Sequence, residues 1–168
     1  MTASLKRLSS DYEQHEDRIR LIGESESGET VVMWITQRLL GRVVTALLQI
    51  LEKESPEAAQ AAGGREIVQS FAQEAAVAGL KRQEPVAAQQ STPTWLVHTV
   101  DVTPAAPHVA LAFRSRQGEA AAVRFHMTEL RQWLAILHSV WVGAHWPAAL
   151  WPGWIASGTA SSDETIRH

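Results

Sequence analysis

The chain has 168 residues, of which 45% are apolar, and a formal net charge of −3 at pH 7. This length and apolar content favour one compact domain with its own core and exclude global disorder. The sequence contains no cysteine, which excludes disulfides, thiolate catalysis and cysteine metal sites and is compatible with a reducing compartment. The negative charge argues against a surface that binds nucleic acid throughout, although it is compatible with a local basic face.

The N-terminal segment, residues 1–17, is polar and crowded with charge. Asp11 and His15 are one helical turn apart, but no spacing here specifies the three or more converging ligands that a metal site needs. We therefore predict a solvated segment, and we expect neither a metal nor a cofactor. The segment has no apolar core after its first charges, which predicts no secretory signal. No later stretch gives a clean apolar run of about 18 residues, so we expect no membrane insertion.

A β-hairpin followed by a helix is the strongest structural signal in the sequence. Residues 18–23 alternate arginine with isoleucine or leucine, as in a half-buried strand, and residues 30–35 are β-branched and apolar. Thr36 provides a hydroxyl that can cap a helix over residues 37–51, where leucines and valines recur at three- and four-residue steps. We expect this helix to pack on the strand before it.

A second helix is predicted over residues 57–81, because Pro56 suits the first turn of a helix. Gly63 and Gly64 should break or kink it. Residues 83–93 are rich in glutamine, alanine and proline, which predicts an exposed linker. The apolar stripe of the helix is thin and consists of Ile67, Phe71, Ala75, Ala78 and Leu80.

Three further strands and a long helix are predicted after the linker. The strand-like stretches cover residues 94–102, 108–116 and 119–127. Thr128 can cap an apolar-striped helix that Pro147 terminates. Residues 157–168 are small and polar, which predicts a flexible tail.

The two halves of the chain follow a similar order of elements. Residues 19–29 and 109–119 match in their apolar positions and in a Gly-Glu turn, and each half continues with a strand, a threonine cap and a helix. Duplication of a ββα unit and chance convergence both account for this likeness. We predict an α+β fold, with an antiparallel sheet of about five strands and helices packed on one face. The predicted organisation is a single domain over 1–168, made of a first half at 1–82, the linker at 83–93, a second half at 94–156 and the tail.

The period of two in a strand assigns alternate residues to opposite faces of the sheet. The residues expected in the core are Ile19, Leu21, Met33, Ile35, Leu111, Phe113, Val123 and Phe125. The residues expected on the outer face are Arg18, Arg20, Trp34, Arg114, Arg124 and His126, with Trp95 if its strand is in phase. Arginine and tryptophan are enriched in protein interfaces, but they also bind single-stranded nucleic acid through phosphate charge and base stacking. A protein interface, a homodimer interface, a nucleic-acid surface and a plain amphipathic exterior are therefore all open.

The C-terminal region supplies a secondary candidate patch. Trp146, Trp151 and Trp154 cluster around Pro152 and Gly153. They are predicted either to contact a partner or to fold back over the preceding helix as core. A membrane-surface anchor fits less well, because the region lacks the basic face that such helices use.

No catalytic fingerprint is present: the sequence has no Gly-x-Ser-x-Gly, no His-Glu-x-x-His and no P-loop. We hypothesise a non-catalytic accessory or interaction protein that self-associates or docks a protein partner. The alternatives are a nucleic-acid-binding module that uses the outer sheet face, and an enzyme or small-ligand binder with an unrecognised site. The chain has no asparagine and few lysines, which suits a GC-rich bacterial genome and weakens the arginines as a sign of phosphate binding. We expect a cytoplasmic location.

Overall fold

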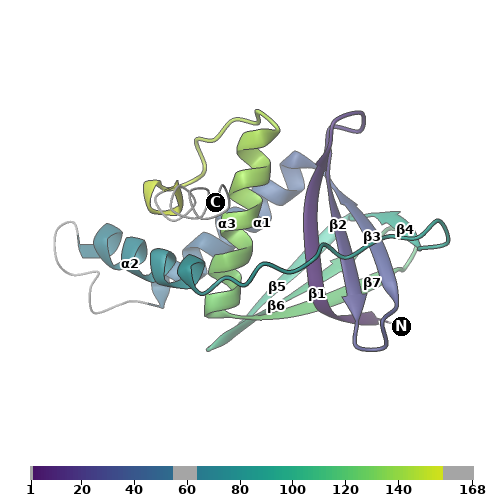
Figure 1. Ribbon diagram of the computed structural model, residues 1–168, viewed down its shortest axis with the longest axis horizontal. Helices are drawn as coiled ribbons and strands as arrows, with labels where there is room; N and C mark the ends of the chain where they lie inside the picture. Colours follow the sequence, from purple (N-terminus) through teal and green to yellow (C-terminus); the bar gives the residue numbers. More distant parts are fainter. Residues whose placement is uncertain (1, 55–63, 157–168) are drawn as a thin grey trace. The chain divides into compact units, whose positions relative to one another are not determined.

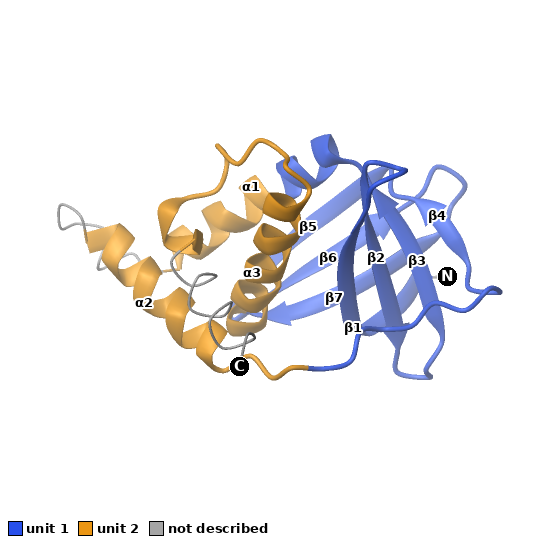
Figure 2. Cartoon of the chain, turned by 45° about the horizontal axis from the view of Figure 1, so that its top comes forward, with its two compact units in different colours: residues 1–43, 83–126 blue, residues 44–82, 127–168 orange. Residues whose placement is uncertain are grey.

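The computed structural model describes residues 2–54 and 64–156, and the statements below concern these residues. The elements, drawn in Figure 1, are β1 (Thr2–Glu13), β2 (Arg18–Ser25), β3 (Thr30–Ile35), α1 (Gln37–Lys53), α2 (Gly64–Ala78), β4 (Thr94–Leu96), β5 (Thr99–Ala105), β6 (His108–Arg114), β7 (Ala120–His126) and α3 (Met127–Gly143). They form two compact units, residues 1–43 with 83–126 and residues 44–82 with 127–168 (Figure 2). Each predicted half of the chain therefore contributes to both units.

The first unit is built on one mixed sheet of seven strands in the order β4-β3-β2-β1-β7-β6-β5. β1 pairs antiparallel with β2 but parallel with β7, and β3 pairs parallel with β4. The α+β class agrees with the prediction, whereas an antiparallel sheet of about five strands is only roughly right. The additional strands come from the N-terminal segment, which forms β1, and from the stretch after the linker, which forms both β4 and β5. The packing of helices on one face and the duplication stay predictions.

One segment of the chain belongs to both ends of this sheet. Val97 N donates to Trp34 O on β3 at 2.8 Å, and His98 N donates to Arg114 O on β6 at 2.8 Å. Because two consecutive residues bond to strands near opposite ends of the strand order, the sheet curls round until its ends meet at residues 97–98.

The side chains that the strand period assigned to the core are buried. Ile19, Leu21, Met33, Ile35, Leu111 and Phe113 are 0% exposed, and Val123 and Phe125 are 5% and 7% exposed. The predicted alternation is confirmed for these eight positions. Burial of each side chain of this size contributes about 1.5–3 kcal/mol relative to leaving it in water.

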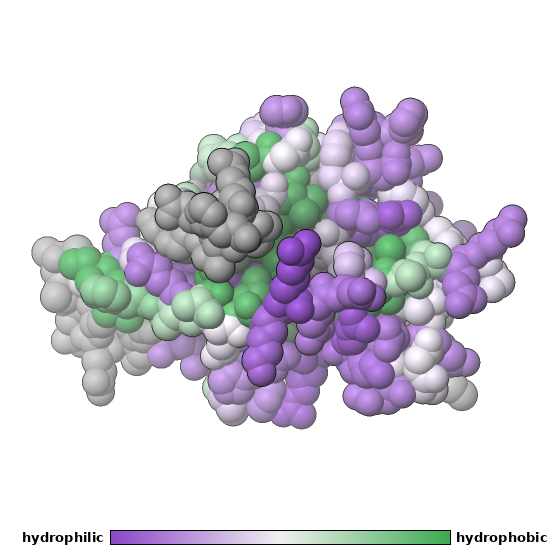
Figure 3. Space-filling view, viewed as in Figure 1, coloured by the Kyte–Doolittle hydropathy of each residue, from purple (hydrophilic) through white to green (hydrophobic). Residues whose placement is uncertain are grey.

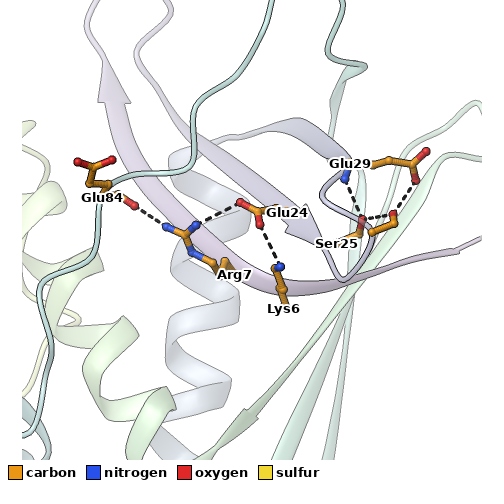
Figure 4. Close-up of polar contacts among 7 residues, drawn as sticks. Lys6, Arg7, Glu24, Ser25, Glu29 and Glu84 are labelled. Atoms are coloured by element: carbon orange, nitrogen blue, oxygen red, sulfur yellow. Dashed lines mark hydrogen bonds and ion pairs between the residues drawn. The ribbon is translucent and has the colours of Figure 1, made fainter.

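β1 is a strand although its sequence is polar, so the segment that was predicted to be solvated also forms part of the sheet. Lys6 Nζ and Arg7 Nη1 each contact a carboxylate oxygen of Glu24 on β2 at 3.2 Å (Figure 4). Asp11 and Arg20 form a second cross-strand ion pair at 2.6 Å. Opposite charges on the neighbouring strand thus compensate the polar side chains of a half-exposed strand, and each such pair is worth about 0.2–1 kcal/mol.

Residues 83–93 contain no helix or strand, but they are held against the sheet. Val86 is 4% exposed and packs with Ile22 and Val32, whose side chains lie on the outer face. Val86 N donates to Ser9 Oγ at 2.8 Å, and Val32 N donates to Pro93 O at 2.9 Å. This segment therefore covers part of the outer face of β1–β3.

α1 begins as predicted and continues from the first unit into the second. Thr36 caps it, because Leu39 N donates to Thr36 Oγ1 at 3.3 Å and Leu40 N donates to Thr36 O at 2.9 Å. The second unit contains α2 and α3 and has a core that includes Leu47, Leu51, Leu130, Leu134, Leu137 and Trp141. The predicted start of the second helix, including Gly63, and the tail at 157–168 lie outside the described residues. None of the helices in the described ranges combines the length and apolar character needed to cross a membrane.

Candidate interaction surface

The outer face of β2 and β3 brings Arg20 and Trp34 together, opposite each other in the strand register. Arg20 Nε and Nη2 donate to the two carboxylate oxygens of Asp11 on β1 at 3.0 and 2.6 Å. These hydrogen bonds raise the pKa of Arg20. Arg18 is half-buried and lies opposite Glu13. A carboxylate therefore already neutralises Arg20, which reduces its capacity to attract a phosphate.

The two tryptophans expected on this face behave differently. Trp34 is half-buried and packs against the cluster of Ile22, Val32 and Val86. Trp95 is 8% exposed and lies opposite Met33, whose side chain is in the core. The strand of Trp95 is thus out of phase with the outer face, and Leu96, which is 44% exposed and opposite Trp34, takes that place.

The remaining outer-face residues lie on β6 and β7. Arg114 Nε donates to Asp101 Oδ2 at 2.9 Å. Arg124 Nη2 is 3.3 Å from His108 Nδ1, and the rings of His108 and His126 meet edge to face at 5.4 Å. Arg114, Arg124 and His126 are exposed, and His108 is half-buried. The described residues contain no group of three or more His, Asp or Glu side chains placed to hold a metal ion.

The C-terminal tryptophans are buried in the second unit. Trp146, Trp151 and Trp154 are 7%, 9% and 4% exposed. Trp141 meets Trp146 and Trp151 edge to face at 4.9 and 5.9 Å, and its Nε1 donates to Pro147 O at 2.9 Å. The chain after α3 thus folds back over the end of that helix. A partner could reach these three rings only if this packing opened.

A buried polar network joins α2 to α1 and α3. Gln69 Nε2 donates to Leu51 O at 3.1 Å, and Gln69 Oε1 accepts from Arg131 Nη2 at 2.6 Å. Gln73 Nε2 donates to Arg131 O at 2.9 Å, and the guanidinium of Arg131 lies over the ring of Trp154 at 5.5 Å. Arg131 is 7% exposed, and burial lowers its pKa to about 10. Among the described residues no carboxylate contacts this guanidinium, and its Nη1 has no hydrogen-bond partner.

His138 gives the second unit a pH-dependent stability. Its side chain is 9% exposed, its ring lies 5.1 Å from that of Trp151, and burial lowers its pKa below 6.5. Just below pH 6.5, His138 therefore binds a proton in the unfolded chain but stays neutral in the folded chain. Because the unfolded state binds more protons, the free energy of unfolding falls as the pH falls through that value. The slope is limited to about 1.4 kcal/mol per pH unit for one group.

Urea unfolding at several pH values should show a shallower slope for His138→Gln. The exposed His98 supplies the control His98→Gln, and an equal slope in all three proteins would contradict this assignment.

α2 turns its apolar stripe outward. Gln69, Gln73, Ala76 and Val77 form the buried side of this helix, whereas Ile67 is 59% exposed and Phe71 is 69% exposed. Ala75 and Ala78, which continue the stripe, are exposed as well. The apolar surface over α2 is visible in Figure 3. An apolar stripe ordinarily faces a core, so the periodicity of this helix alone does not identify the stripe as surface.

The described part of the chain therefore offers two candidate surfaces, the paired arginine–tryptophan face of the sheet and the apolar stripe of α2. Comparison of the chain with protein-family models, with curated proteins and with solved structures finds no match. The fold and the chemistry of these two surfaces are thus the basis for a functional proposal.

Proposed function

We propose that this chain is a non-catalytic interaction protein that docks a protein partner through the outward stripe of α2, formed by Ile67, Phe71, Ala75 and Ala78. The observation that supports this proposal is the 69% exposure of Phe71 beside the 59% exposure of Ile67. Two large apolar side chains one helical turn apart form a contiguous patch, and such patches mark interaction sites. Covering a side chain of this size contributes about 1.5–3 kcal/mol.

The orientation of α2 is fixed by its opposite side. Gln69 and Gln73 bond to Leu51 O, to Arg131 O and to the guanidinium of Arg131. Turning Phe71 inward would take both amides out of these contacts and leave buried polar groups without partners, which costs about 1–3 kcal/mol for each group. The hydrogen bonds of Gln69 and Gln73 therefore hold the apolar stripe toward solvent.

The nucleic-acid alternative has less support. Arg20 and Arg114 each contact an aspartate, at 2.6 and 2.9 Å. Trp95 is buried, so the outer sheet face has one tryptophan fewer for base stacking. For the enzyme alternative, the sequence has no catalytic fingerprint, and the described residues contain no group of three or more His, Asp or Glu side chains placed to hold a metal ion. Protein docking is the function that we place first.

Photo-crosslinking tests this function without assuming the partner. Benzoylphenylalanine at position 71 should give a discrete adduct in cells of the source organism. The same group at position 65, which is exposed and about 120° round the helix, should give none. An adduct of twice 18.5 kDa would identify a second copy of the chain as the partner. No adduct at position 71, or the same adducts from both positions, would refute the docking surface.

A stability measurement checks that Phe71 belongs to the surface and not to the core. Phe71→Ser is expected to change the free energy of unfolding by no more than about 0.5 kcal/mol, because the ring is mostly in water. Urea unfolding followed by tryptophan fluorescence measures this difference. A loss of several kcal/mol would show that Phe71 belongs to the core and would remove the basis of the proposal.

A further inference from the structure

The docking surface on α2 also carries a charge pattern. A shallow depression on this helix is lined by Glu66, Ile67, Ser70, Phe71 and Glu74. Along the helix Glu66 precedes the apolar pair and Glu74 follows it, and both carboxylates lie on the same side of this pair. None of these lining residues is basic. The surface is therefore apolar with an acidic margin.

We infer that the occupant of this surface is an amphipathic helix of another protein, with an apolar ridge flanked by basic residues. This inference rests on the proposed function and adds the chemistry of the partner. Glu66 and Glu74 are eight residues apart, which corresponds to about 12 Å along the helix axis. A partner helix with lysine or arginine two turns apart would match both carboxylates while its apolar residues cover Ile67 and Phe71.

The shape of the stripe favours a helix over an extended segment. Ile67, Phe71, Ala75 and Ala78 follow one another at steps of four, four and three residues, so they form a straight ridge along α2. Ala75 and Ala78 are small and exposed, which allows the backbone of a second helix to approach closely at this end. A helix laid against a helix through residues at three- and four-residue spacing is a common recognition mode.

Charge argues against a second copy of α2 as the occupant. In an antiparallel pair centred on Ser70, Glu66 of each copy would lie opposite Glu74 of the other. In a parallel pair, each glutamate would lie opposite itself. Like charges placed opposite each other destabilise an interface, whereas a basic partner gains from the same residues.

Binding of two synthetic peptides tests the charge of the partner. Both are helices of about 20 residues with leucine along one face, and the residues that flank this face are lysine in one peptide and glutamate in the other. Fluorescence anisotropy should show that the unchanged protein binds the lysine peptide about tenfold more tightly, and that salt weakens this preference. The double variant Glu66→Lys/Glu74→Lys should prefer the glutamate peptide instead.

A control variant separates the local charge from the net charge. Glu16→Lys/Glu26→Lys makes the same change in net charge at two exposed residues elsewhere, and it should keep the preference for the lysine peptide. Equal binding of both peptides, a preference that survives the reversal at Glu66 and Glu74, or no binding of either peptide would overturn the basic partner. So would a dimer in sedimentation velocity that Phe71→Ser abolishes. The crosslink at position 71 does not depend on charge, so its failure alone would refute the docking surface.

Discussion

Replacing Trp141 with alanine is expected to destabilise the protein by about 3–5 kcal/mol. Trp141 is 1% exposed and lies between the rings of Trp146 and Trp151. Its removal leaves a cavity, breaks two edge-to-face ring contacts and leaves Pro147 O without the Nε1 donor. Urea unfolding followed by the fluorescence of the remaining tryptophans measures the loss.

Trp141→Phe is the matched control, because it keeps an aromatic ring and removes only the hydrogen bond and part of the volume. We expect it to cost clearly less than the alanine variant. A loss below about 1 kcal/mol for Trp141→Ala would contradict the packing described for the second unit. In that case the three C-terminal tryptophans would regain the role of an accessible patch.

Replacing Arg131 with alanine is expected to cost about 2–5 kcal/mol, because it leaves a cavity under Trp154 and removes the donor to Gln69 Oε1. Arg131→Met should recover most of this loss. Methionine fills the space of the side-chain stem and has no charge to desolvate, and the guanidinium has no carboxylate contact among the described residues. Thermal or urea unfolding of the three proteins at pH 7 makes the comparison.

The pair of variants distinguishes two roles for a buried guanidinium. If an acidic group compensated the charge, removing the arginine would leave that group buried alone, and methionine would be as damaging as alanine. Such a result would show that the charge is essential to the network. Similar stabilities of the unchanged protein and Arg131→Met would show that the network depends on packing and on the glutamine amides.

The sequence predicts some elements of this fold because their signals are local. β3 covers the predicted residues 30–35, and α1 begins after Thr36 because both the cap and the apolar steps lie within one short stretch. The alternation of buried residues on β2, β6 and β7 follows in the same way from a period of two. Each of these features depends on residues that are neighbours in the chain.

β1 was not predicted because a polar strand resembles a solvated segment when it is considered alone. The charged residues opposite β1 on β2 indicate that it is a strand. Arg7 lies opposite Glu24, Asp11 opposite Arg20 and Glu13 opposite Arg18, all in one hairpin register. This alternation of opposite charges about a single turn is present in the sequence, and it could have predicted the hairpin. The parallel pairing of β1 with β7 had no local signal.

The sequence did not show that the apolar stripe of α2 is a surface, for a related reason. Apolar periodicity indicates which residues of α2 share a side, but it does not show which side is buried. The buried side of α2 is determined by Gln69 and Gln73, whose hydrogen-bond partners belong to α1 and α3. The phase of Trp95 was likewise left open, because β4 has three residues and its pairing with β3 is parallel.

The parallel pair of β1 and β7 has a consequence for how the chain folds during synthesis. It joins Leu5 to Val123, so β1 is synthesised long before the strand with which it pairs in parallel. Until residue 126 has emerged, β1 has a neighbour on one flank only. Closing so long a loop costs entropy before any contact across it forms, which makes such pairing slow. The two halves of the sequence are therefore interdependent in folding, and neither a nascent N-terminal fragment nor an isolated C-terminal one can complete the sheet.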